Sequence, residues 1–208
     1  MIDARGNAVA VTVTLNSSYG SGVYVQEAGF FLNNEMDDFA AVPGQPNQFG
    51  LVESEKNAIA PGKRMLSSMT PTIVLDSAGT PLLVLGAAGG PTIITAVTQV
   101  VLNVLDHHMP LGEAVAATRI HHQAWPDSLA YERGGLRTAV LDSLRAMGYA
   151  LDPRGSIATL NALMRVGGGY VGVGEPRYSR VGPTGIGGVG PGDGAPRPRP
   201  ETSRPEGK

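Results

Sequence analysis

The stretch TIVLDSAGTPLLVLGAAGGP, residues 72–91, decides the fold of this chain. Two apolar runs, Thr72–Leu75 and Leu82–Leu85, flank a short polar turn, which is typical of a β-hairpin. A glycine-rich turn, Gly86–Gly90, follows the second run. Pro91 then opens a long apolar segment, and proline is common at the first position of a helix. The stretch therefore predicts a hairpin that leads through a tight turn into a buried helix.

Further elements are expected on both sides of this stretch. Strand character is found at 8–14, 23–25, 30–32, 160–166 and 170–173, the last two forming a closing hairpin. Helices are predicted at 91–106, 111–118 and 136–147. In the first of these the β-branched content favours a strand, whereas the length favours a helix. Paired strands followed by helices predict an α+β or layered α/β domain.

Two segments lack regular periodicity. The loop at about 33–64 is rich in proline and glycine and carries carboxylates at its start, so we interpret it as a functional loop. After about Arg180, glycine and proline dominate without apolar periodicity. We therefore divide the chain into a domain at 1–178 and a disordered tail at 179–208. The basic, proline-rich end of this tail is also compatible with a peptide ligand for another domain, although a bland tail is favoured.

Composition excludes several classes of function. The net charge is −2 and the pI about 6.1, which gives no reason to expect nucleic acid as a partner. No cysteine is present, which excludes disulfides, thiolate metal sites and a cysteine nucleophile. The longest apolar stretch, Thr92–Leu105, is interrupted by polar residues and is too short for a membrane span, which needs about 20 residues. We expect a soluble protein without a cofactor.

Polar side chains gather in several short segments. Alternation along the first predicted strand places Thr14 and Asn16 on one face. Glu35 and Asp38 belong to a run of three carboxylates beside an aromatic residue, which would be costly to bury without partners. A cradle for an ammonium group and a solvated acidic loop start are equally compatible with this run.

Two further segments suit an anion. Ser67 and Ser68 precede a strand and offer hydroxyl donors to a carboxylate, although a serine-rich turn is the commoner explanation. Gly89 and Gly90 lie before a helix, where two backbone N–H groups are able to stabilise an oxyanion. This turn lacks the spacing of a phosphate-binding loop, and no lysine follows it.

The histidines form two adjacent pairs, 107–108 and 121–122. Neither pair has the helical spacing of a zinc site, and adjacent side chains point in different directions. We therefore interpret the histidines as structural and predict no metal site.

Taken in order, these segments resemble the small subunit of γ-glutamyltranspeptidases over roughly residues 1–178. The most specific stretches are NNEMDDF at 33–39 and LSSMTP at 66–71; GNAVAVT at 6–12, TLN at 14–16, GAAGG at 86–90 and RIHHQ at 119–123 accompany them. The resemblance implies an α+β fold, a four-layer αββα sandwich of the N-terminal-nucleophile hydrolase type. It implies no cofactor, a large subunit cut from the same precursor as partner, and a periplasmic or extracellular location, with the cytoplasm not excluded.

The resemblance also implies roles for individual residues in cleaving the γ-glutamyl bond of glutathione. Thr14 would support an amino-terminal threonine nucleophile, and Gly89 and Gly90 would form the oxyanion hole. The α-amino group of the glutamyl moiety would be held by Asn16, Glu35 and Asp38, and its α-carboxylate by Ser67 and Ser68. Phe49 would lie in a loop, 42–63, that covers the site. The acyl-enzyme then passes to water or to an acceptor amino acid or peptide.

The chain departs from the family pattern at its start. Family small subunits begin with a Thr-Thr-His-like segment immediately before the position of Met1, and this segment, with the nucleophile, is not in the sequence. The large subunit, which in the family supplies an arginine for the substrate carboxylate, is also absent. We therefore expect the chain to be a fragment that is inactive alone, and to expose an apolar interface. The alternative is a non-catalytic protein that binds γ-glutamyl compounds or a partner subunit.

Overall fold

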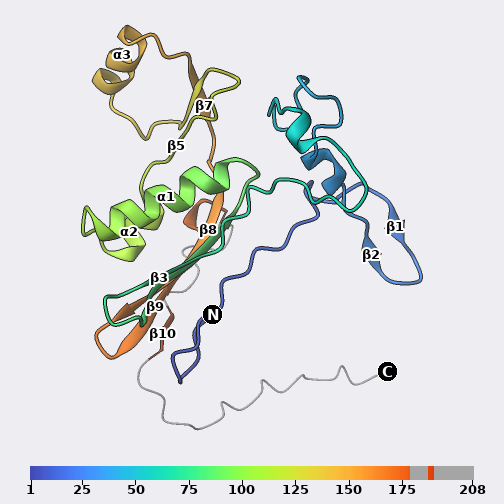
Figure 1. Ribbon diagram of the computed structural model, residues 1–208. Coiled ribbons are helices and arrows are strands. Elements are labelled where there is room, and N and C mark those ends of the chain that lie inside the picture. Colours follow the sequence, from blue (N-terminus) through green and yellow to red (C-terminus); the bar gives the residue numbers. More distant parts are fainter. Residues whose placement is uncertain (179–186, 190–208) are drawn as a thin grey trace, which may run out of the picture.

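The computed structural model describes residues 1–178 and 187–189 (Figure 1). Within these residues the largest sheet has five strands in the order β10-β9-β8-β4-β3, and every neighbouring pair is antiparallel. The strands are β3 (Thr72–Leu75), β4 (Pro81–Ala88), β8 (Thr159–Val166), β9 (Gly169–Val173) and β10 (Gly187–Val189). Strand β4 lies inside the sheet and leads directly into the glycine turn.

Two helices, α1 (Thr92–Leu105) and α2 (Leu111–Ala116), cover one face of this sheet (Figure 1). Leu83, Leu85 and Ala87 alternate along β4 toward the helices and are nearly or fully buried, and α1 presents Ala96 and Val100 to them. Burying one such leucine or valine side chain contributes roughly 1.5–3 kcal/mol. This contact fixes the start of α1, and therefore the glycine turn, against the sheet.

A second group of elements lies beyond the helices. It contains the sheet β5-β6-β7, formed by Ile120–His121, Leu129–Glu132 and Leu151–Arg154, and helix α3 (Thr138–Ala146). Strands β5 and β6 are antiparallel, whereas β6 and β7 are parallel. The loop region before β3 contains the hairpin β1 (Tyr24–Val25) and β2 (Phe30–Phe31) and the short helices η1 (Glu35–Asp38) and η2 (Glu55–Asn57); η3 (Pro176–Tyr178) follows β9.

Most of the predicted elements are confirmed. The hairpin at 72–85, the closing hairpin and the three helices are present, and no end is shifted by more than three residues. The apolar segment after Pro91 is a helix, as its length indicated. The sheet β5-β6-β7 was not predicted, because its strands are short and lie between segments without alternation.

The strand predicted at 8–14 is wrong. The chain instead folds back on itself, so that the amide of Val9 donates to the carbonyl of Met1 over 2.9 Å, and residues 9–14 belong to no sheet within the described residues. The alternation itself is real, since Val9, Val11 and Val13 are exposed by 47%, 66% and 84% while the residues between them are partly covered. These β-branched side chains therefore face outward without a neighbouring strand.

Part of the predicted tail is described. Residues 187–189 form β10 and pair with β9, so this short piece differs from the expected disordered tail. The rest of 179–208 lies outside the described residues. None of the helices in the described part of the chain has the length and apolar character needed to cross a membrane.

A buried network of charges joins the two groups of elements. The guanidinium of Arg119, 1% exposed, donates to Glu175 over 2.8 Å and to the carbonyls of Ile157 and Ala158 over 3.0 and 3.2 Å. Arg177 binds the same glutamate and also Glu132, at 2.8 and 2.5 Å. The network ties the end of α2, the start of β8 and the segment after β9 together.

The two glutamates in the network are held ionised. Burial alone would raise the pKa of Glu132, but hydrogen bonds from Arg177 and from the backbone of Arg119 outweigh it, and the pKa is lowered. The pKa of Glu175 is also lowered, because bonds from Arg177, the Leu160 amide and Arg119 outweigh burial. A carboxyl group with a lowered folded-state pKa stabilises the fold above its unfolded pKa, and this stabilisation is lost as the pH falls through the folded value.

Replacing Arg119 tests the importance of this network. We expect Arg119→Met to lower the free energy of unfolding by about 3–5 kcal/mol, because Glu175 loses one of its two arginine partners and the buried carbonyls of Ile157 and Ala158 lose their donor. Urea denaturation measures the loss. The exposed Arg133→Met is the control and is expected to change stability by less than about 0.5 kcal/mol. Equal effects of the two substitutions would contradict the structural role of the network.

Candidate active site

The segments that stand out in the sequence meet around one cavity of about 810 Å³. It lies between the amino-terminal segment, the loop after residue 33 and the glycine turn. The predicted site residues that line it are Thr14, Asn16, Asp38, Ser67, Ser68, Gly89 and Gly90. Glu35 does not line the cavity. It is partly buried behind Asp38.

Two carboxyl groups, Glu35 and Asp38, interact at one end of the cavity. Burial raises the pKa of Glu35, and the nearby charge of Asp38 raises it further. Burial also raises the pKa of Asp38; the charges of Asp37 and Glu53 add to this, and hydrogen bonds from Glu35 and Asn16 only partly offset it. The side-chain oxygen Oε1 of Glu35 is buried and has no hydrogen-bond partner among the described residues. This end of the cavity therefore has excess negative charge and favours a cation.

The backbone around Asn16 is shaped by local hydrogen bonds. The hydroxyl of Thr14 accepts from the Asn16 amide over 2.8 Å, and the Asn16 side chain donates to the carbonyl of Asn34 over 3.3 Å. Asn16 has a φ of 72°, in the left-handed region that asparagine tolerates better than most residues. These bonds hold the amide of Asn16 next to the acidic residues of η1.

Asn57, which the sequence analysis missed, joins the acidic and serine segments. Its side chain is 4% exposed and donates to the backbone carbonyl of Asp38 over 2.7 Å. Its side-chain oxygen accepts from the amide of Leu66 over 3.1 Å, one residue before the serines. The hydroxyl of Ser67 accepts from the Met69 amide over 3.2 Å. No signal in the sequence marks Asn57, because nothing distinguishes this asparagine from the less buried asparagines nearby.

The glycine turn admits no side chains. Gly89 has a φ of 146°, and a Cβ on it would lie 2.9 Å from the Cα of Ala158. Gly90 has a φ of 58°, and a Cβ there would lie 2.8 Å from the ring of Phe49. The Thr92 hydroxyl donates to the carbonyl of Gly89 over 2.7 Å. Within the described part of the chain the N–H groups of both glycines donate no hydrogen bond, so they are available to a ligand oxygen.

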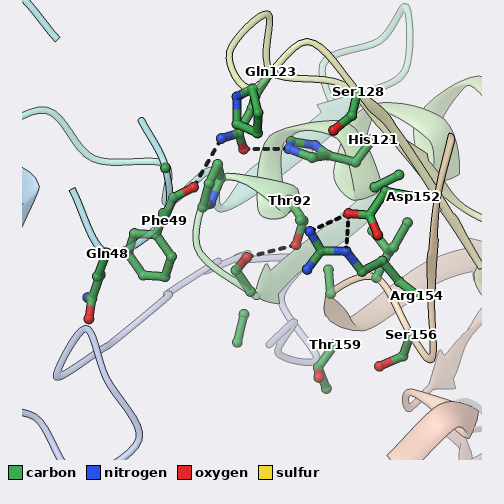
Figure 2. Close-up of a pocket in the computed structure, with 18 residues that line it drawn as sticks. Gln48, Phe49, Thr92, His121, Gln123, Ser128, Asp152, Arg154, Ser156 and Thr159 are labelled. Atoms are coloured by element: carbon green, nitrogen blue, oxygen red, sulfur yellow. Dashed lines mark hydrogen bonds and ion pairs between the residues drawn. The ribbon is translucent and has the colours of Figure 1, made fainter. Parts of the chain in front are cut away.

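The loop that contains Phe49 covers the glycine turn. Its tip is a tight turn in which the side chain of Asn47 accepts from the amides of Phe49 and Leu51 over 3.0 and 3.1 Å. The side chain of Gln123 donates to the carbonyl of Phe49 over 3.1 Å, and His121 binds Gln123 over 2.8 Å (Figure 2). His121 is buried and also contacts the hydroxyl of Thr95 at 2.9 Å. This histidine therefore anchors the covering loop to α1.

The comparisons with known proteins agree with this arrangement. The family described as gamma-glutamyltranspeptidase matches residues 1–183. The glutathione hydrolase proenzyme of Pseudomonas aeruginosa is 48% identical over 185 residues, which cover 88% of this chain and 33% of that protein. For the proenzyme of Escherichia coli the identity is 45%, with 85% and 30% covered. The chain belongs to the γ-glutamyltranspeptidase family, and it spans about a third of the length of these relatives.

Solved structures show the same fold. A chain of an acivicin-inhibited γ-glutamyltranspeptidase superposes with a TM-score of 0.83 at 45% identity, covering 86% of this chain and 97% of that one. The enzyme of Pseudomonas nitroreducens complexed with L-DON gives 0.82 at 49% identity, with 88% and 95% covered. A cephalosporin acylase of Bacillus halodurans, 23% identical, gives 0.65 over 76% of this chain and 28% of that one and shares the fold. The predicted α+β fold of the N-terminal-nucleophile hydrolase type is confirmed.

The repulsion between the carboxyl groups of Glu35 and Asp38 should lower the thermal stability of the protein. We expect Glu35→Gln to raise the Tm at pH 7 by about 1–3 °C, because it removes one of two charges that oppose each other. A raised folded-state pKa destabilises the fold above that pKa and has no effect below the unfolded value. The gain should therefore disappear below pH 4.5, the ordinary pKa of glutamate. Calorimetry at both pH values tests this.

The exposed Glu27→Gln is the matched control and should leave the Tm unchanged at both pH values. A lower Tm for Glu35→Gln at pH 7 would show that the carboxylate stabilises the empty site, contrary to the electrostatic argument.

Proposed function

We propose that the protein hydrolyses γ-glutamyl compounds such as glutathione and transfers their γ-glutamyl group through an acyl-enzyme. The observation that carries this proposal is the arrangement around the cavity. Asp38 offers negative charge, Ser67 and Ser68 offer hydroxyl donors, and the glycine turn offers free N–H groups. A glutamyl group has one ammonium, one α-carboxylate and one γ-carbonyl, which these three groups match.

The chemistry assigned to each group follows from its charge. Asp38, with Asn16 beside it and Glu35 behind, holds the ammonium, whose positive charge relieves the excess negative charge there. Ser67 and Ser68 donate to the α-carboxylate. The N–H groups of Gly89 and Gly90 stabilise the oxyanion that forms when a nucleophile attacks the γ-carbonyl. Such preorganised donors typically contribute about 10²–10³ in rate each.

The nucleophile in this proposal is the hydroxyl of an amino-terminal threonine, which its own α-amine deprotonates. Thr14 lines the cavity and positions this threonine. The γ-carbonyl carbon forms an ester with the threonine oxygen, and the leaving amine takes the proton. Water or an acceptor amine then attacks the ester and releases the threonine hydroxyl.

We also propose that the partner is a large subunit of the same precursor. Two observations support this: relatives are named proenzymes, and the chain covers a third of their length but 97% of one chain in a solved structure. The outward valines 9, 11 and 13, and Leu75, 53% exposed on β3, offer an apolar surface to it. A periplasmic or extracellular location belongs to the same proposal.

A second candidate is a non-catalytic protein that binds γ-glutamyl compounds or a partner. One relative favours it: the chain covers 80% of scoloptoxin SSD20 of Scolopendra dehaani, at 36% identity, so the family includes a curated chain of similar extent. In this case the cavity binds its ligand without turnover.

Turnover by an assembled protein separates the two candidates. In this experiment, a Thr-Thr-His-like segment is added in front of the chain, and the extended chain is co-expressed with the large subunit of the Pseudomonas aeruginosa relative. We expect this complex to release the anilide from γ-glutamyl-p-nitroanilide. The 208-residue chain alone is the control and should give no turnover, because no amino-terminal threonine lines the cavity. A correctly assembled complex that binds glutamate without turnover would instead support the second candidate.

Two neighbouring carboxylates test the ammonium site in the active complex. We expect Asp38→Asn to lower kcat/KM by about 30-fold or more, since losing a charged partner of a buried ion typically costs about 2–5 kcal/mol. Asp37→Asn is the matched control. The side chain of Asp37 accepts from the Gln48 amide over 3.1 Å, and asparagine keeps an acceptor oxygen. We expect it to change kcat/KM less than about twofold. Equal losses would place the ammonium site elsewhere.

A further inference from the structure

A second cavity, of about 530 Å³, adjoins the glycine turn on its other side (Figure 2). The two cavities share Phe49, Ala88, Gly89, Pro91, His121 and Gln123. The shared wall is therefore the glycine turn with its covering loop. The predicted γ-glutamyl residues Thr14, Asn16, Asp38, Ser67 and Ser68 line only the first cavity.

The far side of the second cavity carries one guanidinium. Among the described residues of its lining, Arg154 is the only arginine and Asp152 the only carboxylate, and both lie on β7. The Nε and Nη2 atoms of Arg154 contact one oxygen of Asp152 at 2.6 and 2.5 Å. This contact uses the Nε and Nη2 edge of the guanidinium and does not involve Nη1. Figure 2 shows the pair across the cavity from Phe49.

The guanidinium of Arg154 and the glycine turn line the same cavity. Gly89 lines both cavities. For a carbonyl carbon bound at Gly89 with its glutamyl part in the first cavity, we therefore expect the other substituent to extend toward the second. Hydroxyl groups of Ser128 and Thr159 also line the second cavity, which is large enough for an amino acid or a dipeptide. Guanidinium groups bind carboxylates in preference to neutral groups through paired N–H donors.

We propose that the second cavity binds the acceptor of γ-glutamyl transfer, an amino acid or short peptide with a free carboxylate, and that Arg154 recognises this carboxylate. Asp152 is a positioning residue that orients the guanidinium. The acceptor amine, at the opposite end of the molecule, then lies at the glycine turn. Its nitrogen attacks the acyl-enzyme ester, a C–N bond forms and the C–O bond breaks. The amine proton passes to the threonine, which regains its hydroxyl.

The inference rests on the proposed function, and the experiment distinguishes the two. Arg154→Gln is made in the active complex, and both hydrolysis of a γ-glutamyl anilide and transfer to glycylglycine are measured. We expect the KM for glycylglycine to rise by about 10-fold, the effect of losing one charge-assisted bond. Hydrolysis without an acceptor should keep its kcat and its donor KM within about twofold.

An acceptor without the carboxylate gives a second readout. The unsubstituted complex should prefer glycylglycine to glycylglycine amide, and Arg154→Gln should lose this preference. Arg154→Lys keeps the charge and should retain part of it. Arg145→Gln is the matched control, because Arg145 is similarly exposed and is paired with Asp142 outside the cavity.

The outcomes separate the two proposals. An unchanged KM for glycylglycine in Arg154→Gln, or a preference that persists, overturns the acceptor site while hydrolysis stands. A parallel loss of hydrolysis shows that Arg154 acts on the acyl cavity instead and also overturns the inference. Absence of hydrolysis in the unsubstituted complex contradicts the proposed function itself.

Discussion

The rest of the structure depends on the burial of Arg119. Its guanidinium is surrounded by carbonyls and by Glu175, and it fixes Ile157 and Ala158 at the start of β8. Ala158 in turn lies where a side chain on Gly89 would need to be. The position of the glycine turn is therefore set in two ways. The charge network acts on it through Ala158, and the packing of β4 against α1 holds it against the sheet. The buried Nε of Arg119 has no hydrogen-bond partner among the described residues. Because a deeply buried ion is costly unless it is paired, a change in the remaining contacts of the network should also affect the turn.

The electrostatics of the cavity have the opposite character. The network around Arg119 pairs its charges, whereas within the described residues no basic side chain pairs with Glu35 or Asp38. Burial that is unfavourable in the empty protein becomes favourable when an ammonium arrives, so part of the binding free energy comes from relieving this repulsion. Perturbed carboxyl groups beside a cavity are common at functional sites for this reason. The paired charges that stabilise the fold and the repelling carboxyl groups of the candidate site therefore lie in different parts of the chain.

Much of this arrangement was predictable from the sequence. The hairpin of β3 and β4, helix α1 and the glycine turn followed from periodicity, and the resemblance supplied the segments that gather around the cavity. The sequence wrongly predicted a strand at Val9, Val11 and Val13, which are exposed. Alternation shows that the side chains point to two different sides of the chain, but it does not show whether another strand pairs with the backbone. The sequence also did not predict that Arg119, Glu132 and Asn57 are buried, since nothing local marks a polar residue that long-range contacts bury. Arg154 escaped notice because its cavity forms only when β7 meets the turn.

The central claim is that the cavity beside the glycine turn binds the glutamyl group with its ammonium at Asp38. A crystal structure of the assembled protein with L-glutamate tests this most directly. The account predicts the ammonium within about 3 Å of a carboxylate oxygen of Asp38, the α-carboxylate at Ser67 and Ser68, and the γ-carboxylate at the N–H groups of Gly89 and Gly90. Glutamate bound in the reverse orientation, or bound at Arg154 with the first cavity empty, would contradict it.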